Sequence, residues 1–487
     1  MKKAKKQPLK VEAMPYLNMK KHPILRGCFF VFLLVFSSFS AQAEPLSQVP
    51  KNQQQLNLTY APIVAYAAPA VVNVYAKRIV QRRRPSLFND PFFNDFFGQQ
   101  NRPRQQLQNS LGSGVLVRDD GIVVTNNHVI EGSESLTVVL SDQREYQADI
   151  LLADARTDLA ILKLRTDKKT QFPYLVYHDE DEVEVGDLVL AIGNPFGVGQ
   201  TVTSGIVSGL ARTQVGVSDF QSFIQTDAAI NPGNSGGALV TMDGRLLGVN
   251  TAIFTRSGGS IGIGFAIPAN MVRRVVEAAL AENGTGRVKR AWLGARLQYV
   301  TQELAETLGL PRPMGALLLE VHQQSPFAQA GLRSGDVVTA VEKRQINRPE
   351  ELRYRLAVQE IGATVKIHYL REGSKYTAQV MMREAPENPP RNLYRGHLRN
   401  LFFGIELSNI NPAVAEEIGL SEGGQGVVVV KGNPQSRLGL QIGDILLKLN
   451  GQEIKKVADA VVKIEENPNR WSLEVKRGNR IIRSTIR

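Results

Sequence analysis

Residues 112–268 restrict the possible fold class more than any other part of the sequence, because they consist of short apolar runs separated by turns. Frequent short strands at this spacing are typical of an all-β barrel or sandwich. A helix should follow, since Asn270 precedes apolar residues at helical spacing and Gly284 comes after them. The runs that predict strands are 115–117, 122–125, 136–140, 159–164, 188–192, 202–208, 223–226, 238–240, 246–252 and 264–267.

Within this region, Ser235 stands on a glycine-rich turn between Asn234 and Gly236-Gly237. Glycine lets the backbone adopt conformations that other residues avoid, so successive N–H groups can point into one small space. A serine oxygen beside such N–H groups is the arrangement of a nucleophile with an oxyanion hole. The alternative is an ordinary tight turn between two strands, since Asn-Pro-Gly and Ser-Gly are common turn sequences.

A serine nucleophile needs a base, and the base needs a group that orients it. His128 ends a strand-like run, and Asp158 begins an apolar strand. Taken singly, each has a structural alternative, as a core histidine or as a cap at a strand entry. The order His128, Asp158, Ser235 is that of chymotrypsin-type double barrels, so the three together predict a catalytic triad.

Two further units follow the barrel region, and each contains a Gly-Leu-x-x-Gly-Asp core. The cores begin at Gly331 and Gly439, 108 residues apart, which indicates a tandem repeat. Before each core lies a small loop, at Leu293-Gly294 and at Phe403-Gly404. The two units resemble a PDZ pair, and the resemblance implies that such a loop directs N–H groups at the terminal carboxylate of a peptide while the next strand accepts that peptide as an added strand. The alternative is that the core only turns a helix into a strand.

Residues 1–43 have the pattern of a secretory signal peptide. They combine a basic start, an apolar core around Cys28 to Phe36 and the small-x-small sequence Ala41-Gln42-Ala43. An uncleaved membrane anchor is the alternative, although the apolar run is short for a span of about 20 residues. Cys28 is the only cysteine, so we expect no disulfide or thiol chemistry after cleavage.

The formal net charge of +12 does not predict nucleic-acid binding, because residues 1–43 hold eight of the basic residues and a single acidic one. We expect no cofactor. We also expect no metal site, since the six histidines are scattered.

The motifs Thr125-Asn126-Asn127-His128-Val129, Thr157-Asp158-Leu159-Ala160 and Gly233-Asn234-Ser235-Gly236-Gly237 resemble those of the HtrA (Deg) serine proteases. The repeated C-terminal units resemble the PDZ pair of its DegP/DegQ branch. The resemblance implies an all-β chymotrypsin-like double β-barrel followed by two α+β PDZ domains. The implied boundaries are a signal peptide at 1–43, a protease domain at 44–286 with a long loop at about 81–109, PDZ domains at 288–384 and 397–487, and a linker at 385–396.

The resemblance also implies roles for single residues. His128, Asp158 and Ser235 would be catalytic, and the N–H groups of Gly233, Asn234 and Ser235 would line the oxyanion hole. Ala229 and Ile230 would line an uncharged substrate pocket suited to small aliphatic side chains, although the nearby Asp227 leaves a preference for basic side chains open. Further expected sites are the regulatory Arg212, in a sensor loop, and the peptide-binding residues Leu293, Gly294, Phe403 and Gly404.

The implied function is ATP-independent cleavage of unfolded or misfolded envelope proteins in the periplasm, together with chaperone activity. Two alternatives stay open: a chaperone or scaffold in which cleavage is secondary, and a membrane-anchored stress-sensing protease. The expected partners are unfolded polypeptides and further copies of the chain, while peripheral membrane association is left open. The long loop carries five phenylalanines that would be costly to expose, and in the resembling family it reaches neighbouring subunits, so we expect a homotrimer that can form larger cages. The phenylalanines are Phe88, Phe92, Phe93, Phe96 and Phe97.

Overall fold

The computed structural model describes the chain from residue 59 to residue 486, with gaps. The signal-peptide region and the phenylalanine-rich loop lie outside the described residues. The described ranges are 59–80, 106–166, 170–179, 182–194, 199–212, 223–231, 233–253, 262–281, 288–398, 400–420, 425–466 and 470–486.

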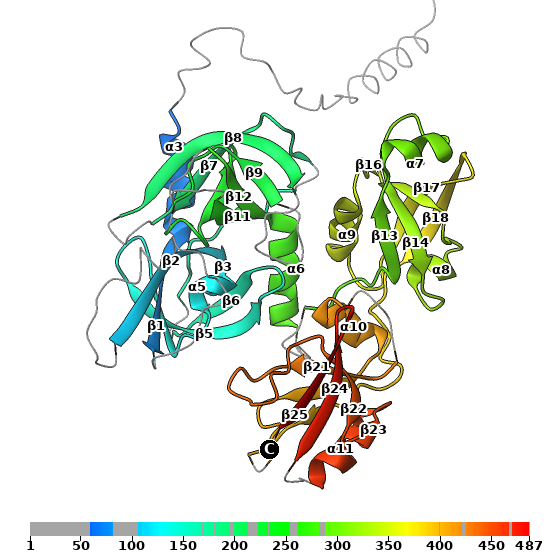
Figure 1. Cartoon of the computed structure of the whole chain (residues 1–487). Coiled ribbons are helices and arrows are strands. Elements are labelled where there is room, and N and C mark those ends of the chain that lie inside the picture. Colours follow the sequence, from blue (N-terminus) through cyan, green and yellow to red (C-terminus); the bar gives the residue numbers. More distant parts are fainter. Residues whose placement is uncertain are drawn as a thin grey trace, which may run out of the picture. The chain divides into compact units, whose positions relative to one another are not determined.

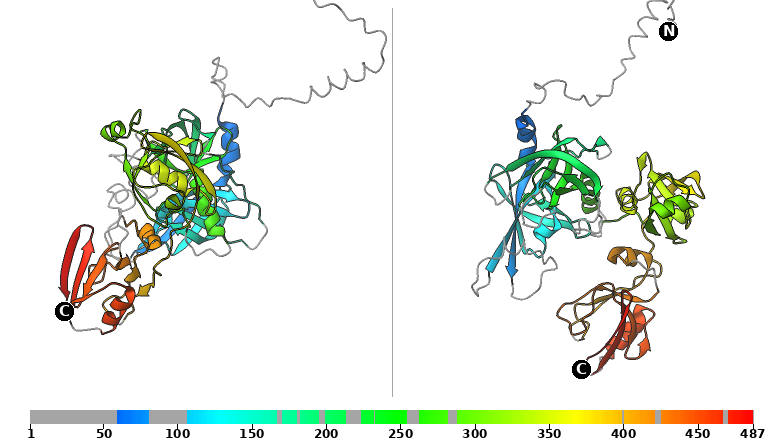
Figure 2. Two further views of the ribbon diagram at one scale, coloured as in Figure 1. Left: turned by 90° about the vertical axis from the view of Figure 1, so that its right-hand side faces the viewer. Right: turned by 45° about the horizontal axis from the view of Figure 1, so that its top comes forward.

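The first six strands close into a barrel (Figure 1), with the strand order β1-β2-β3-β6-β5-β4. Closure leaves no free sheet edge, and apolar side chains fill the interior, with every residue of β3 buried. β1 and β2 continue as a two-stranded ribbon beyond the segment that pairs with β4 (Figure 2). The elements are α3 (Ala61–Ala67), a 3₁₀ helix (Ala68–Ala70), β1 (Val71–Val80), β2 (Gln106–Arg118), β3 (Ile122–Asn126), α5 (Asn127–Ile130), β4 (Ser135–Val139), β5 (Glu145–Asp154) and β6 (Leu159–Leu164).

A second closed barrel has the order β10-β11-β12-β9-β8-β7. α6 follows it and contacts β5 and β6 of the first barrel as well as β11 and β12 of the second (Figure 1). Its Val272, Val275 and Val276 are buried, as the helical spacing of the sequence predicted. The double barrel is thus confirmed. Its elements are β7 (Leu188–Gly193), β8 (Thr201–Arg212), β9 (Phe223–Thr226), β10 (Ala238–Thr241), β11 (Leu246–Ile253), β12 (Gly264–Pro268) and α6 (Ala269–Leu280).

The first C-terminal module is a sheet with the order β13-β14-β15-β17-β18, in which β16 also pairs with β15. Its own hydrophobic core contains Phe327, Leu352 and Ile367. The elements are β13 (Ala295–Tyr299), α7 (Gln302–Thr307), β14 (Ala316–Val321), α8 (Pro326–Gln329), β15 (Val337–Val341), β16 (Arg344–Gln345), α9 (Pro349–Ala357), β17 (Thr364–Arg371) and β18 (Ser374–Met381).

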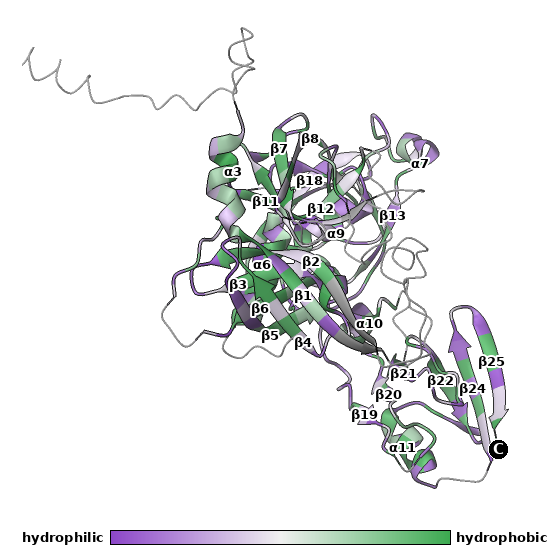
Figure 3. Ribbon diagram, turned by 90° about the vertical axis from the view of Figure 1, so that its left-hand side faces the viewer, coloured by the Kyte–Doolittle hydropathy of each residue, from purple (hydrophilic) through white to green (hydrophobic). Residues whose placement is uncertain are grey.

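The second module repeats this order, apart from the short helix α8, and adds one strand, β19, at the edge. Hydrophobic and hydrophilic residues alternate along β24, whose buried residues face a separate core (Figure 3). The elements are β19 (Tyr394–Arg395), β20 (Glu406–Asn409), α10 (Pro412–Ile418), β21 (Val427–Lys431), β22 (Ile445–Leu449), β23 (Gln452–Glu453), α11 (Val457–Glu465), β24 (Trp471–Arg477) and β25 (Arg480–Ile486).

Each module contains its own arginine–aspartate ion pair, with the same geometry in both. In the first, the Arg371 guanidinium donates to both carboxylate oxygens of the buried Asp336, each at 2.7 Å, and to the Gly331 carbonyl at 2.8 Å. In the second, Arg477 makes the same three bonds to Asp444 and to the carbonyl of Gly439. The aspartate of each Gly-Leu-x-x-Gly-Asp core is therefore a fold-stabilising residue.

The expected boundary of the second module needs correction. Tyr394 and Arg395 fall in the segment expected to be a linker, 385–396, yet they form β19 and pair with β20. The proline-rich composition of this segment suggested a connection without regular structure, but backbone pairing with the module includes part of it in the sheet. The second sheet therefore begins at Tyr394 rather than at residue 397.

Candidate active site

His128 and Asp158 meet at one end of the first barrel. His128 lies in the short helix α5, directly after β3, and Asp158 lies in the turn between β5 and β6. The histidine Nδ1 is 2.8 Å from Asp158 Oδ2 and 3.0 Å from Oδ1, and the backbone N–H of His128 donates to Oδ1 at 3.0 Å. A carboxylate only accepts hydrogen bonds, so this contact favours the tautomer with its hydrogen on Nδ1 and leaves Nε2 as the basic nitrogen.

Asp158 adopts a left-handed backbone conformation, with φ of 57°. Aspartate tolerates this region better than most residues. Its carbonyl accepts hydrogen bonds from the Asn126 side chain at 3.0 Å and from the Asn127 N–H at 3.1 Å. The sequence motif contained Asn126, but its role of fixing this turn was not apparent from the sequence alone.

Thr251 of β11 connects the two halves of the site, and sequence reasoning missed it. Its hydroxyl donates to Asp158 Oδ2 at 2.7 Å, while its carbonyl accepts from Ser235 Oγ at 3.2 Å. Thr251 stands where the pairing of β11 with β12 changes register, and such a bulge redirects a side chain. Because the register of a barrel strand decides this placement, no local sequence signal could have identified it.

The Ser235 turn is held against the first barrel by Ser113. The backbone N–H of Ser113 donates to the Ser235 carbonyl at 2.9 Å, and its buried hydroxyl donates to the Gly233 carbonyl at 2.6 Å. Gly236 has φ of 84°, and a Cβ there would lie 2.0 Å from the Ser113 carbonyl oxygen. Only glycine fits this close approach, which explains the glycine that follows the serine.

The three N–H groups expected in the oxyanion hole do not share one orientation. The Asn234 N–H donates to the Asn231 carbonyl at 2.9 Å within the turn, so it is not directed at a substrate. The prediction for Asn234 is corrected on this point. Gly233, whose φ is 98°, and Ser235 remain as the candidate donors.

The two predicted pocket residues, Ala229 and Ile230, lie in different environments. Ile230 is buried in the core of the second barrel, where its side chain lies against Gly264; this contradicts its expected place in an open pocket. Ala229 is partly exposed, and its carbonyl accepts from the Thr203 hydroxyl at 2.9 Å. The Asp227 carboxylate accepts from the Ile206 N–H at 2.7 Å, which gives it a structural partner.

The remaining predicted residues belong to β8 and to the two C-terminal modules. Arg212 is the last residue of β8, and the loop that follows it is outside the described residues. In the first module Leu293 is buried, whereas Phe403 at the matching position of the second is exposed. Gly294 and Gly404 both have a left-handed backbone, with φ of 61° and 73°, although residues 401–404 form a turn and residues 291–294 have no regular secondary structure.

We expect Thr251→Val to lower kcat by about 10- to 100-fold, because a hydrogen bond to a charged group contributes about 1.5–3 kcal/mol. Valine matches threonine in shape but cannot donate to Asp158. Steady-state kinetics on a peptide substrate measures the effect, with Thr251→Ser as the matched control that keeps the hydroxyl. Equal kcat values for the two variants would exclude a positioning role for Thr251.

Comparisons with known proteins agree with this geometry. Residues 112–249 match the trypsin-like peptidase domain family, and residues 291–382 match the PDZ domain family. Among curated proteins, a probable periplasmic serine endoprotease DegP-like of Chlamydia trachomatis is 37% identical over 436 residues, covering 87% of this chain and 82% of the relative. The protein of the same name from Marinomonas sp. is 39% identical over 417 residues, covering 82% and 87%.

Solved structures give the same assignment. The HtrA-type protease AlgW with a tripeptide matches with a TM-score of 0.51 and 39% identity, covering 68% of this chain and 99% of that one. No helix in the described part of the chain has the length and apolar character needed to cross a bilayer. The chain is a serine endopeptidase with a His-Asp-Ser triad, and it belongs to the HtrA family of DegP-like proteases.

Proposed function

We propose that this chain is a periplasmic endopeptidase that degrades unfolded envelope proteins without ATP. The observation that carries the proposal is the hydrogen-bonded path from His128 through Asp158 and Thr251 to Ser235. The names of the curated relatives support the compartment, and a signal peptide at residues 1–43 would deliver the chain there. The peptide modules add binding surfaces that suit a chaperone activity beside cleavage.

In the proposed mechanism, Ser235 Oγ attacks the peptide carbonyl while His128 takes its proton and later gives it to the leaving amine. Asp158 keeps the imidazole oriented and stabilises its charged form. The N–H groups of Gly233 and Ser235 stabilise the oxyanion, and losing one such donor typically costs on the order of 10²–10³ in rate.

Incubation of the mature chain, residues 44–487, with reduced casein and with a stably folded protein of similar size tests the proposal. We expect casein to be degraded without nucleotide while the folded protein stays intact. Degradation of neither protein would contradict it, and so would equal degradation of both.

Cleavage should follow small aliphatic residues such as Val, Ala or Ile. Ala229 offers a small, uncharged position, whereas Asp227 already accepts the Ile206 N–H on one carboxylate oxygen. Mass spectrometry of the casein fragments identifies the residue before each cut. A majority of cuts after Lys or Arg would instead assign the pocket to Asp227.

The proposed assembly is a homotrimer that can enlarge into cages. The phenylalanine-rich loop supports it, because five aromatic side chains in a polar segment call for a covering surface.

We further propose that a peptide bound at the first PDZ module activates the protease through Arg212. A guanidinium can bond several carbonyls at once, which suits a contact between this loop and the turn around the oxyanion hole. Arg212→Ala should reduce the stimulation of turnover by a hydrophobic C-terminal peptide without lowering the melting temperature. Equal stimulation of the variant and the unaltered chain would remove Arg212 from the mechanism.

A further inference from the structure

The second PDZ module differs from the first at the edge where such modules accept peptides. A PDZ ligand joins the sheet as an extra strand, with its terminal carboxylate beside the loop that precedes the accepting strand. In the first module that strand is β13, which pairs with β14. In the second it is β20, which pairs with β21 on one side and with β19 on the other.

The segment 389–396, which includes β19, runs along β20 in the same direction as a PDZ ligand runs along its accepting strand. Its pairing with β20 is antiparallel, with Tyr394 opposite Leu407 and Arg395 opposite Glu406. Near the start of this segment, the Arg391 carbonyl accepts the Asn409 N–H at 2.8 Å. It therefore advances toward the loop at Phe403-Gly404, as a peptide with its C-terminus at that loop would.

Gly396 stands where the last residue of a ligand would be. Its N–H donates to the Ile405 carbonyl at 2.9 Å, and its carbonyl accepts the Gly404 N–H at 3.3 Å. A terminal carboxylate would compete for that same Gly404 N–H. A Cβ at Gly396 would lie 1.8 Å from the Phe402 carbonyl oxygen, so this approach to the loop requires glycine.

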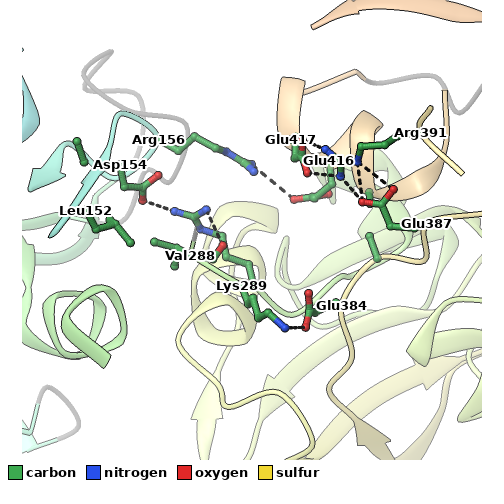
Figure 4. Close-up of a pocket in the computed structure, with 14 residues that line it drawn as sticks. Leu152, Asp154, Arg156, Val288, Lys289, Glu384, Glu387, Arg391, Glu416 and Glu417 are labelled. Atoms are coloured by element: carbon green, nitrogen blue, oxygen red, sulfur yellow. Dashed lines mark hydrogen bonds and ion pairs between the residues drawn. The ribbon is translucent and has the colours of Figure 1, made fainter. Parts of the chain in front are cut away.

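Side-chain hydrogen bonds and ion pairs hold the segment in place along its length. The Arg391 guanidinium donates to the two carboxylate oxygens of Glu417 at 2.7 and 3.1 Å, and its Nε donates to Glu387 at 2.9 Å (Figure 4). The side-chain amides of Asn409 and Asn411 donate to the carbonyls of Pro390 and Pro389, at 2.8 and 2.7 Å. Bidentate arginine–carboxylate pairs fix geometry as well as adding energy.

At the far end of the segment, Tyr394 packs against the module's core, and Arg395 Nε lies 3.6 Å from Glu406 Oε1. Backbone pairing, a core contact and ion pairs thus act on the same few residues. Contacts of these kinds are those that hold a tightly bound strand. Because β19 belongs to the same chain, its binding does not cost the translational and rotational freedom that a separate peptide would lose.

We propose that residues 389–396 of this chain occupy the peptide-binding edge of its own second PDZ module, so that a hydrophobic C-terminal peptide binds at the first module only. The claim of one peptide per chain rests on the peptide binding proposed for the first module. The occupancy of the edge does not depend on it.

Disulfide trapping tests the occupancy. In the full chain with Cys28→Ser, the pair Arg395→Cys and Glu406→Cys places two thiols opposite each other across β19 and β20. We expect mild oxidation to form an intramolecular disulfide, seen by mass spectrometry. The control pair is Arg395→Cys with Lys431→Cys; Lys431 pairs with Glu406 from the other side, so it lies two strands away. Equal oxidation of both pairs, or none in the first, would overturn the proposal.

Isothermal titration with a decapeptide ending in three hydrophobic residues tests the stoichiometry, in a chain carrying Ser235→Ala to prevent cleavage. We expect one peptide per chain. Gly294→Val should abolish binding, because a Cβ there would lie 2.3 Å from the Ser325 Cβ, while the matched Gly404→Val should leave it unchanged. Two peptides per chain, or binding lost only with Gly404→Val, would overturn the proposal. No binding to the Ser235→Ala chain would count against the first module, and disulfide trapping would still decide the occupancy.

Discussion

Replacing Ser235 with alanine should reduce casein cleavage by a factor on the order of 10⁶, as loss of the nucleophile does in other serine proteases. The change removes the one oxygen that bonds to the substrate carbonyl. The turn should keep its shape, because Ser113 holds it through the carbonyls of Ser235 and Gly233 rather than through the lost hydroxyl. A gel-based or fluorescent casein assay measures the loss.

The control for Ser235→Ala is its melting temperature, which should stay close to that of the unaltered chain because little packing is removed. Cleavage by the purified variant at the unaltered rate would disprove the assignment of the nucleophile. Loss of cleavage together with a large drop in melting temperature would point to an effect on the fold instead.

The second large effect is expected for Asp158→Asn, which should lower kcat about 10⁴-fold. The turn should persist, because the backbone carbonyl of residue 158 still accepts from Asn126 and Asn127, and the asparagine oxygen can still accept from the Thr251 hydroxyl. Its amide hydrogens, however, would face Nδ1 of His128 and favour the tautomer that carries its hydrogen on Nε2. That tautomer cannot accept the serine proton.

Single-turnover kinetics on a peptide substrate measures the loss for Asp158→Asn. A matched control is Asp149→Asn in β5, because Asp149 is exposed and pairs with Arg165 at the surface. Similar rates for both variants would show that the Asp158 carboxylate does not act on the histidine.

The sequence was sufficient to predict the all-β region, the triad and the tandem repeat, and its resemblance to a known family implied the double barrel, the PDZ modules and the enzyme class. These predictions depend on patterns that are local in the chain, such as short apolar runs, a glycine turn and the order of three motifs. The contributions of Thr251 and Asn126 depend on strand register and on a left-handed turn, and neither property can be read from neighbouring residues. The sequence therefore identified the three triad residues better than the residues that position the triad.

The predictions that needed correction share a cause. The roles of Ile230 and Asn234 were implied by the resemblance, through their places beside Ala229 and Ser235, but the fold directs the Ile230 side chain into the barrel core and the Asn234 N–H toward Asn231. The segment 385–396 was assigned by composition, and its pairing partner lies ten or more residues away. In each case a tertiary contact decided the orientation that local sequence left open.

The division of the site between two closed barrels has a further consequence. His128 and Asp158 belong to one barrel, whereas Ser235 and Thr251 belong to the other. Since each barrel completes its own strand ladders, a small slip of one against the other would break no strand pairing. Such a slip would break hydrogen bonds that join the barrels, among them those from Ser113 to the serine turn, from Thr251 to Asp158 and from the Asn194 N–H to Ser113 Oγ. The alignment of the triad therefore depends on contacts between the barrels, which are different contacts from the strand pairings that close each barrel.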